Sequence, residues 1–251
     1  MAGSFSVPAA AATVPTATLV VRHSALVRIT HWITAVCFLA LLVTGVEILI
    51  SHPRFYWGET GNILTPPLFS IPIPASRGTV PTGYGYVLPD QNGWSRYLHF
   101  QAAWLAVLTG ILYVTYGLVT GHFRRNLIPA DLSWRAISTT FANHLRLKLA
   151  KESGAASYNV LQRLAYLFVI FVLFPLDIWT GLAMSPAIAS VFPAAVSILG
   201  GQQSARTIHF FVSVLLLLFL LVHVAMVCLS GFRNHMRAMF AGDRARKRIY
   251  E

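Results

Sequence analysis

Four histidines lie inside long apolar stretches of this sequence, where an ionisable side chain is costly and needs a partner or a function. They are His31, His99, His209 and His223. The last two share one stretch, and their fourteen-residue spacing turns an α-helix to about 40° short of four full turns and advances it about 21 Å. One helix face would therefore present histidines to two sites stacked about 20 Å apart.

Neutral imidazole is a common axial ligand of b-type haem, and facing histidines in the core of a helix bundle are typical of such sites. Because the first and fourth apolar stretches would run in opposite directions, we expect His31 and His223 to reach one depth and His99 and His209 another. This predicts two haem b groups, held without covalent attachment because no Cys-x-x-Cys-His motif occurs. A single membrane histidine can instead hydrogen-bond a neighbouring carbonyl, but four that pair in depth favour haem.

The elements that position these histidines are predicted to be helices of bilayer length, which takes about 20 mostly apolar residues. The fold class is therefore all-α, an integral membrane four-helix bundle that forms a single domain over residues 1–251. The helices are expected at about residues 24–50, 97–121, 162–185 and 207–231, between a flexible tail at 1–23 and a basic tail at 232–251.

A long outer loop is predicted between the first two helices. Its roughly 45 residues, from His52 to Arg96, contain seven prolines and cannot form a helix of any length. A connection of this size exceeds ordinary loops, which predicts a docking surface or another function.

Composition supports a membrane protein, since 56% of the 251 residues are hydrophobic and only 11% are charged. The net charge of +11 comes from short basic stretches between apolar runs, so nucleic acid is not expected as a partner.

The distribution of Lys and Arg predicts the orientation, because basic flanks stay on the cytoplasmic side. Fourteen of these residues lie in the N-terminal flank, the connection between the second and third helices, and the C-terminal tail; four lie in the other two connections, and Arg163 lies at the mouth of the third helix. Both termini are therefore expected in the cytoplasm, with the protein in the bacterial inner membrane.

Two helix motifs carry a family resemblance. The first helix has Val27-Arg28-Ile29-Thr30-His31-Trp32 followed by Thr44-Gly45, and the fourth has Ser204-Ala205-Arg206-Thr207-Ile208-His209 followed by His223. These motifs resemble the di-haem cytochrome b subunits of bacterial nickel-iron hydrogenases, formate dehydrogenases and thiosulfate reductases, a cytochrome b561-type family. Resemblance is closest to the thiosulfate reductase branch, through Ser51-His52-Pro53, Tyr56-Trp57-Gly58, Gly121-His122-Phe123-Arg124-Arg125, Tyr158-Asn159 with Gln162, and Gly200-Gly201-Gln202-Gln203.

The resemblance implies the same two histidine pairs as haem ligands. It also implies a membrane anchor that carries electrons between a periplasmic oxidoreductase partner, a molybdenum-cofactor enzyme or hydrogenase-like, and the quinone pool. Related formate dehydrogenase subunits bind quinone near the inner haem, which makes Tyr158, Asn159 and Gln162 the quinone candidates. The alternatives are a stand-alone di-haem quinone-linked oxidoreductase resembling superoxide oxidase and a haem-free transporter or anchor.

Three further ionisable residues stand near the histidines. Arg206 and Arg28 each lie three residues before a histidine, one helical turn away, and either could meet a haem propionate or serve as an interface anchor. Asp177, inside the third stretch, is expected to relay a proton or to pair with a polar neighbour.

Overall fold

The computed structural model describes residues 24–62, 64–72, 91–129, 133, 138 and 160–240. Within them the chain is mostly helical, and four helices are long and apolar enough to cross a membrane. The predicted all-α membrane bundle is confirmed, whereas the predicted N-terminal tail lies outside the described residues. The crossings are α1 (Ala25–Ser51), α3 (Gln91–Val119), the continuous run of α6 (Val160–Phe168), η1 (Val169–Leu173) and α7 (Phe174–Ala183), and α10 (Gln202–Leu229).

Two helices begin earlier than the hydropathy pattern predicted, α3 at Gln91 rather than about 97 and α10 at Gln202 rather than about 207. Hydropathy marks only the part of a helix that matches the bilayer core, and a helix can continue into the polar interface. The expectation that residues 52–96 contain no helix is therefore wrong at its end. Pro89 is the last proline before α3, so no proline interrupts the helix after it.

The third crossing contains a π-helical turn, η1, between two α-helical halves. Pro175, two residues after η1, has no N–H to donate to the carbonyl four residues earlier, which explains a local change of hydrogen-bond pattern here. The second half, α7, packs against α10.

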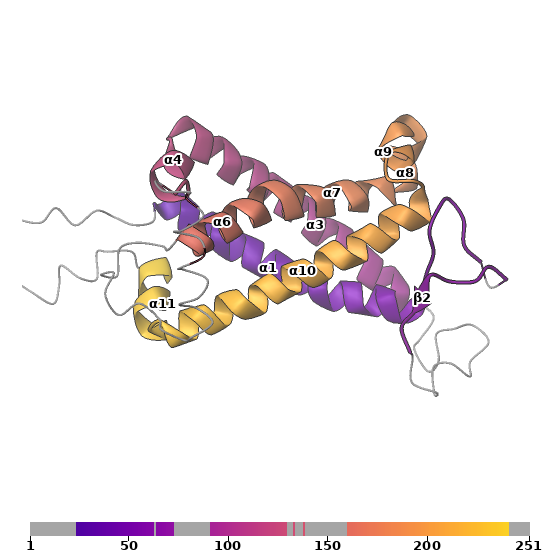
Figure 1. Cartoon of the computed structure of the whole chain (residues 1–251), viewed down its shortest axis with the longest axis horizontal. Coiled ribbons are helices and arrows are strands. Elements are labelled where there is room, and N and C mark those ends of the chain that lie inside the picture. The colour runs from indigo at the N-terminus through magenta and orange to yellow at the C-terminus, as the bar shows by residue number, and fades with distance from the viewer. Residues whose placement is uncertain are drawn as a thin grey trace, which may run out of the picture.

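The helices pack as two pairs, α1 along α3 and α7 along α10. Figure 1 shows the four crossings running between two ends of the molecule. One end, here called the tail end, carries the start of α1 together with α4 (His122–Asn126), α6 and α11 (Phe232–Phe240). The opposite end, called the hairpin end, carries β1 (Arg54–Phe55), β2 (Phe69–Ser70), α8 (Pro186–Val191) and α9 (Ala194–Ser197).

At the hairpin end, β1 and β2 pair antiparallel, with Arg54 opposite Ser70 and Phe55 opposite Phe69. The segment between them is fixed to the start of α10. The Gly58 carbonyl accepts from the backbone N–H of Gln203 at 2.9 Å, and the Gly58 N–H donates to the Ser204 hydroxyl at 2.8 Å. Gly201 has φ +112°, and a Cβ there would collide with the Gly58 backbone, so this close approach requires glycine.

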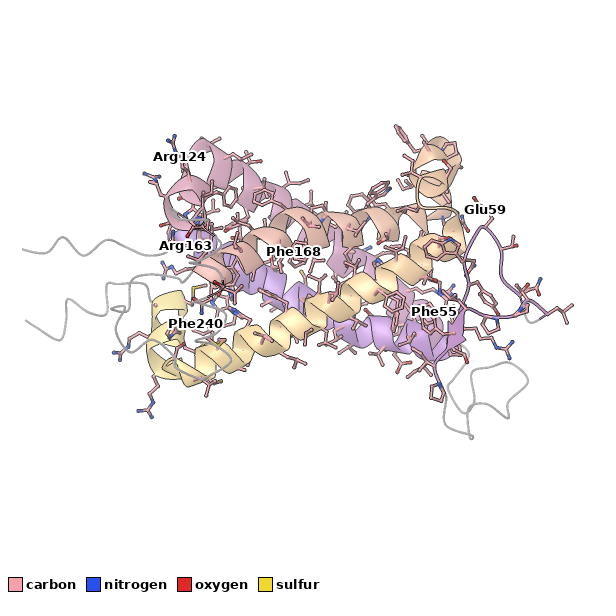
Figure 2. All side chains as sticks on the ribbon, viewed as in Figure 1. Phe55, Glu59, Arg124, Arg163, Phe168 and Phe240 are labelled. Carbon is pink, nitrogen blue, oxygen red and sulfur yellow. The ribbon has the colours of Figure 1, made fainter. Side chains whose placement is uncertain are left out.

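At the tail end, basic side chains gather around the helix ends. Figure 2 shows Arg124 and Arg163 at this end and Glu59 at the other. Arg163 donates to the backbone carbonyl of Ile128 at 3.2 Å, which places it at the tail end. It therefore joins the group of fourteen Lys and Arg residues that the sequence analysis assigned to the cytoplasmic side.

Candidate functional site

The structure brings the four membrane histidines together as two pairs. His31 on α1 faces His223 on α10, with ring centroids 6.3 Å apart. His99 on α3 faces His209 on α10, with centroids 6.4 Å apart. We call His31 and His223 the tail-end pair, and His99 and His209 the hairpin-end pair. α10 contributes one ring to each histidine pair, and the other ring comes from α1 or from α3.

These separations fit a metal ion between the rings of each pair. An imidazole nitrogen lies about 2 Å from a bound metal and the ring centroid about 1 Å further, so two imidazoles on opposite sides of one ion have centroids about 6 Å apart. Both observed separations agree with this value. The donor set, two neutral imidazoles in a helix bundle, is the one that b-type haem takes.

Two buried threonines orient the rings of the hairpin-end pair. The Thr44 hydroxyl donates to the Ala40 carbonyl at 2.7 Å and lies 2.9 Å from Nδ1 of His99. On the other side, Thr180 donates to backbone carbonyls of its own helix and lies 3.0 Å from Nδ1 of His209. Because each hydroxyl hydrogen is already used, the oxygens accept from Nδ1–H, and Nε2 of each ring carries the free lone pair.

A glycine follows each of these threonines and lies against the ring. A Cβ at Gly45 would lie 3.7 Å from Cε1 of His99, and a Cβ at Gly181 would lie 3.4 Å from Cε1 of His209. The Thr-Gly dipeptide therefore occurs once on α1 and once on α7, each time against one ring of the same pair. Thr180 and Gly181 were not among the residues predicted from the sequence. Thr-Gly also occurs elsewhere, for example at Thr109-Gly110 on α3, so the dipeptide alone does not mark a site.

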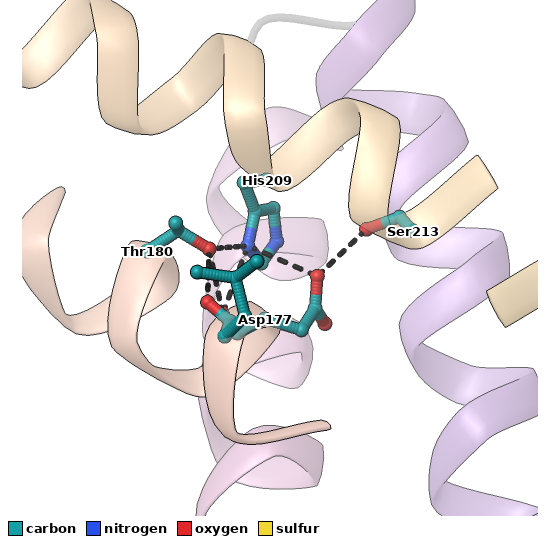
Figure 3. Close-up of polar contacts among 5 residues, drawn as sticks. Asp177, Thr180, His209 and Ser213 are labelled. Atoms are coloured by element: carbon teal, nitrogen blue, oxygen red, sulfur yellow. Dashed lines mark hydrogen bonds and ion pairs between the residues drawn. The ribbon is translucent and has the colours of Figure 1, made fainter. Parts of the chain in front are cut away.

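Asp177 adds a carboxylate to one side of the hairpin-end pair only (Figure 3). Its Oδ1 lies 3.3 Å from Nδ1 of His209, and its backbone carbonyl lies 3.0 Å from the same nitrogen. Ser213, one turn beyond His209 on α10, donates to that Oδ1 at 3.1 Å. Of the two alternatives set out for Asp177, pairing with a polar neighbour is the one that this geometry shows.

Aromatic rings surround the tail-end pair instead. Phe219 stacks on His223 with centroids 5.8 Å apart, and Tyr166 meets the same ring edge-on at 6.1 Å. On α1, Trp32 contacts His31 edge-on at 5.4 Å. Aromatic side chains therefore flank this pair, whose His31 residue is exposed and whose His223 residue is half-buried.

Each of the two arginines near a histidine holds a distant backbone segment. The Arg206 guanidinium donates to the backbone carbonyl of His52 and lies over the Phe55 ring, 4.9 Å from its centroid. Arg28 donates to the carbonyl of Phe240, the last residue of α11, at 3.0 Å. These contacts match the anchor interpretation, and the propionate interpretation stays a prediction.

Two of the three quinone candidates, Tyr158 and Asn159, lie outside the described residues. The third, Gln162, lies on α6 at the tail end, one turn before Tyr166, which touches His223. A cavity of about 380 Å³ also opens at this end between α1 and α11, lined by Arg28, Trp32 and Phe240 among others.

Two histidines outside the crossings are held neutral by their surroundings. Burial and the nearby Arg206 and Arg96 hold the pKa of His52 below its usual value. Burial and Arg125 do the same to the pKa of His122. Neither belongs to a histidine pair.

Comparisons with known proteins agree with the geometry. The sequence profile of the prokaryotic cytochrome b561 family matches residues 22–242. A putative protein-methionine-sulfoxide reductase subunit YedZ1 from Azospira oryzae is 31% identical over 212 residues, 82% of this chain and 90% of that protein. A probable Ni/Fe-hydrogenase B-type cytochrome subunit from Cupriavidus necator is 26% identical over 213 residues, 80% of this chain and 76% of that protein.

The match spans all four crossings and both histidine pairs, so the resemblance seen in the sequence motifs is confirmed at the level of the family. The thiosulfate reductase branch stays a prediction. Haem b binding and electron transport are the properties that a cytochrome b fold of this kind carries. This chain is a multi-pass membrane protein and belongs to the prokaryotic cytochrome b561 family.

Proposed function

We propose that the chain is an electron-transfer subunit that holds two haem b groups, one between His31 and His223 and one between His99 and His209. The observation that carries the proposal is the repeated geometry: two imidazole pairs with centroids 6.3 and 6.4 Å apart, sharing α10 at a fourteen-residue spacing. Haem b, when bound, supplies reversible one-electron transfer at its iron. The chain's own residues fix the depth, orientation and surroundings of each site.

The hairpin end is proposed to face the periplasm and the tail end the cytoplasm of a bacterial inner membrane. Support comes from the Lys and Arg residues: fourteen belong to the segments assigned to the cytoplasmic side and four to the segments assigned to the periplasmic side. Arg163 raises the first number further. Both termini then lie in the cytoplasm, because α1 begins and α11 ends at the tail end (Figure 1).

The hairpin end is proposed to dock a periplasmic redox subunit, either a molybdenum-cofactor oxidoreductase or a hydrogenase-like protein. Apolar side chains of the β1–β2 segment are exposed there, namely Trp57, Leu64 and Leu68. This segment also contacts the helix of the hairpin-end pair, since Phe55 packs on Phe210 with centroids 4.6 Å apart, beside His209. Both relatives are named as subunits of redox enzymes, which supports a partner.

The quinone is proposed to react at the tail end, near His31 and His223. Of the sequence-based candidates Tyr158, Asn159 and Gln162, Gln162 lies on α6 at this end, and the other two lie outside the described residues. The cavity lined by Arg28 and Trp32 offers another candidate space at this end, and Trp32 contacts His31. Two substitutions distinguish these locations: Gln162→Ala tests the start of the third crossing, and Ile33→Phe fills the cavity. Only the substitution at the site that quinone occupies should weaken reduction of the haems by quinol.

The deciding experiment is the haem content of the purified full-length chain. Acid-acetone should extract all the haem, and the pyridine haemochrome assay should give about two b-type haems per chain. A matched control is His122→Ala, which removes a tail-end histidine outside the pairs and should leave the ratio unchanged. A ratio near one or zero for the unmodified chain would contradict the proposal.

A further inference from the structure

We propose that Asp177 is a positioning residue that fixes His209 through its Nδ1–H and makes the hairpin-end pair the lower-potential of the two haem sites. This proposal deepens the proposed function and rests on it, since it requires two haem sites. It assigns to one carboxylate the direction in which electrons pass through the subunit, from the hairpin end toward the tail end.

The first step is the geometry around Nδ1 of His209. Three acceptors converge on this nitrogen: the Asp177 backbone carbonyl at 3.0 Å, the Thr180 hydroxyl oxygen at 3.0 Å and the Asp177 carboxylate at 3.3 Å. An N–H among three acceptors has one stable protonation pattern, with the hydrogen on Nδ1 and the lone pair on Nε2. The His209 ring is therefore presented to a metal in one tautomer and one orientation.

The second step is that the carboxylate is itself held in place. Asp177 and His209 have side chains that are only 21% and 20% exposed, and Ser213 donates to Oδ1 of Asp177 at 3.1 Å (Figure 3). His209 and Ser213 are four residues apart on α10, and Asp177 and Thr180 are three apart on α7. Both couples therefore lie on helix faces that meet, which keeps the carboxylate at this nitrogen.

The third step is that this arrangement occurs at one ring of four. Among the described residues, the polar side chain that hydrogen-bonds the partner ring, His99, is the neutral hydroxyl of Thr44. At the tail end, the His31 and His223 rings contact Trp32, Tyr166 and Phe219. Within the described part of the chain, Asp177–His209 is the one acidic–basic contact within 4 Å.

The fourth step is the physical consequence for the site. A carboxylate that accepts from Nδ1–H raises the basicity of the ligand, and its charge stabilises the more positive, oxidised form of a bound iron. Low dielectric in a membrane interior strengthens this effect relative to water. The hairpin-end site is therefore harder to reduce than the tail-end site, so electrons that enter at the hairpin end pass downhill to the quinone end.

The test is an equilibrium redox titration of the purified full-length chain and its variants. Asp177→Asn keeps the size and the amide oxygen as an acceptor but removes the charge, so one b-type component should move to higher potential while the other stays in place. Ser213→Ala removes the donor that holds the carboxylate and should move the same component by less, with the other component unchanged. The control is Glu59→Gln, which removes another carboxylate at the hairpin end. Glu59 accepts from the Gln202 N–H, and its substitution should shift the potential of neither haem component.

The moving component is assigned in the His31→Ala background, where only the hairpin-end haem should remain. Electron paramagnetic resonance of the oxidised protein adds a second readout, since the low-spin signal of one haem should change when its ligand loses a charged partner. If the unmodified chain binds fewer than two haems, the proposed function is wrong. If two haems bind and Asp177→Asn shifts the potential of neither haem, or of both equally, the proposed role of Asp177 is wrong while the proposed function stands. Should that variant fail to assemble, Ser213→Ala decides on the same criterion.

Discussion

The tail-end pair and the hairpin-end pair have almost the same ring separation but different surroundings. His31 and His223 lie among Trp32, Tyr166 and Phe219, whereas His99 and His209 are fixed by two threonines and, on one side, by Asp177. The common separation is the one that a metal ion held between two imidazoles would require. The differing surroundings are where a protein can assign different roles to two chemically identical sites.

The same contrast extends to the two ends of the molecule. The hairpin end is a packed structure in which Gly58, Ser204 and Thr207 tie the β1–β2 segment to α10, and Thr207 donates to the Tyr56 carbonyl at 2.8 Å. The tail end is basic and carries the amphipathic α11 across the start of α1. Rigid attachment at one end suits a fixed protein partner, while the other end suits a mobile membrane substrate.

The largest expected effect comes from removing one ligand from each pair. His31→Ala should reduce the haem ratio from about two to about one, leave the hairpin-end haem reducible by the partner's substrate, and abolish quinone turnover. His99→Ala should instead block reduction of the remaining haem by the partner. Stopped-flow spectra measure both. If His31→Ala blocks substrate-driven reduction and His99→Ala does not, the two ends have been assigned in reverse.

The next effect concerns the docking surface at the hairpin end. Trp57→Ala removes a large exposed aromatic side chain and should weaken partner attachment by about 2 kcal/mol, roughly 30-fold, if it is an interface anchor. Phe232→Ala removes an exposed aromatic at the tail end and serves as the control. Co-purification and a binding titration are the measurements. Equal attachment by both variants would show that Trp57 does not anchor the partner.

A smaller effect is expected from the threonines of the hairpin-end pair. Thr180→Val and Thr44→Val each remove a hydroxyl that orients a ring, and losses of this kind weaken metal-site affinity by about 10-fold or more. Haem release at the hairpin end should therefore speed up, while the tail-end haem is retained. Thr109→Val, a buried threonine on α3, is the matched control. Loss of both haems to the same extent would show a general folding defect instead.

The smallest effect is a pH dependence of the hairpin end. Burial, Arg206 and Arg96 lower the pKa of His52 in the folded state, so the folded state binds fewer protons than the unfolded state below the usual value of 6.5. Stability of this end should therefore fall as the pH drops through that range. Limited proteolysis of the β1–β2 segment at decreasing pH measures it, and His52→Gln should flatten the profile. An unchanged profile in that variant would assign the effect to another group.

Much of the architecture was predictable because its causes are local. Apolar stretches of bilayer length predict helices, and helix geometry alone places His209 and His223 on one face about 21 Å apart. The pairing of depths follows from the alternation of helix direction. The early starts of α3 and α10 were missed, because a hydropathy pattern marks the bilayer core and not the helix ends.

The contacts that distinguish the two pairs were decided by the tertiary structure. Asp177 and Thr180 meet His209 from about 30 residues away, and Gly58 meets Ser204 from 146 residues away. In a water-soluble protein, the polar face of a helix would indicate its rotation. In a membrane, the lipid-facing and interior faces are both apolar, so the sequence gives little indication of which side of α7 faces α10. Only the packed helices bring one carboxylate to one histidine.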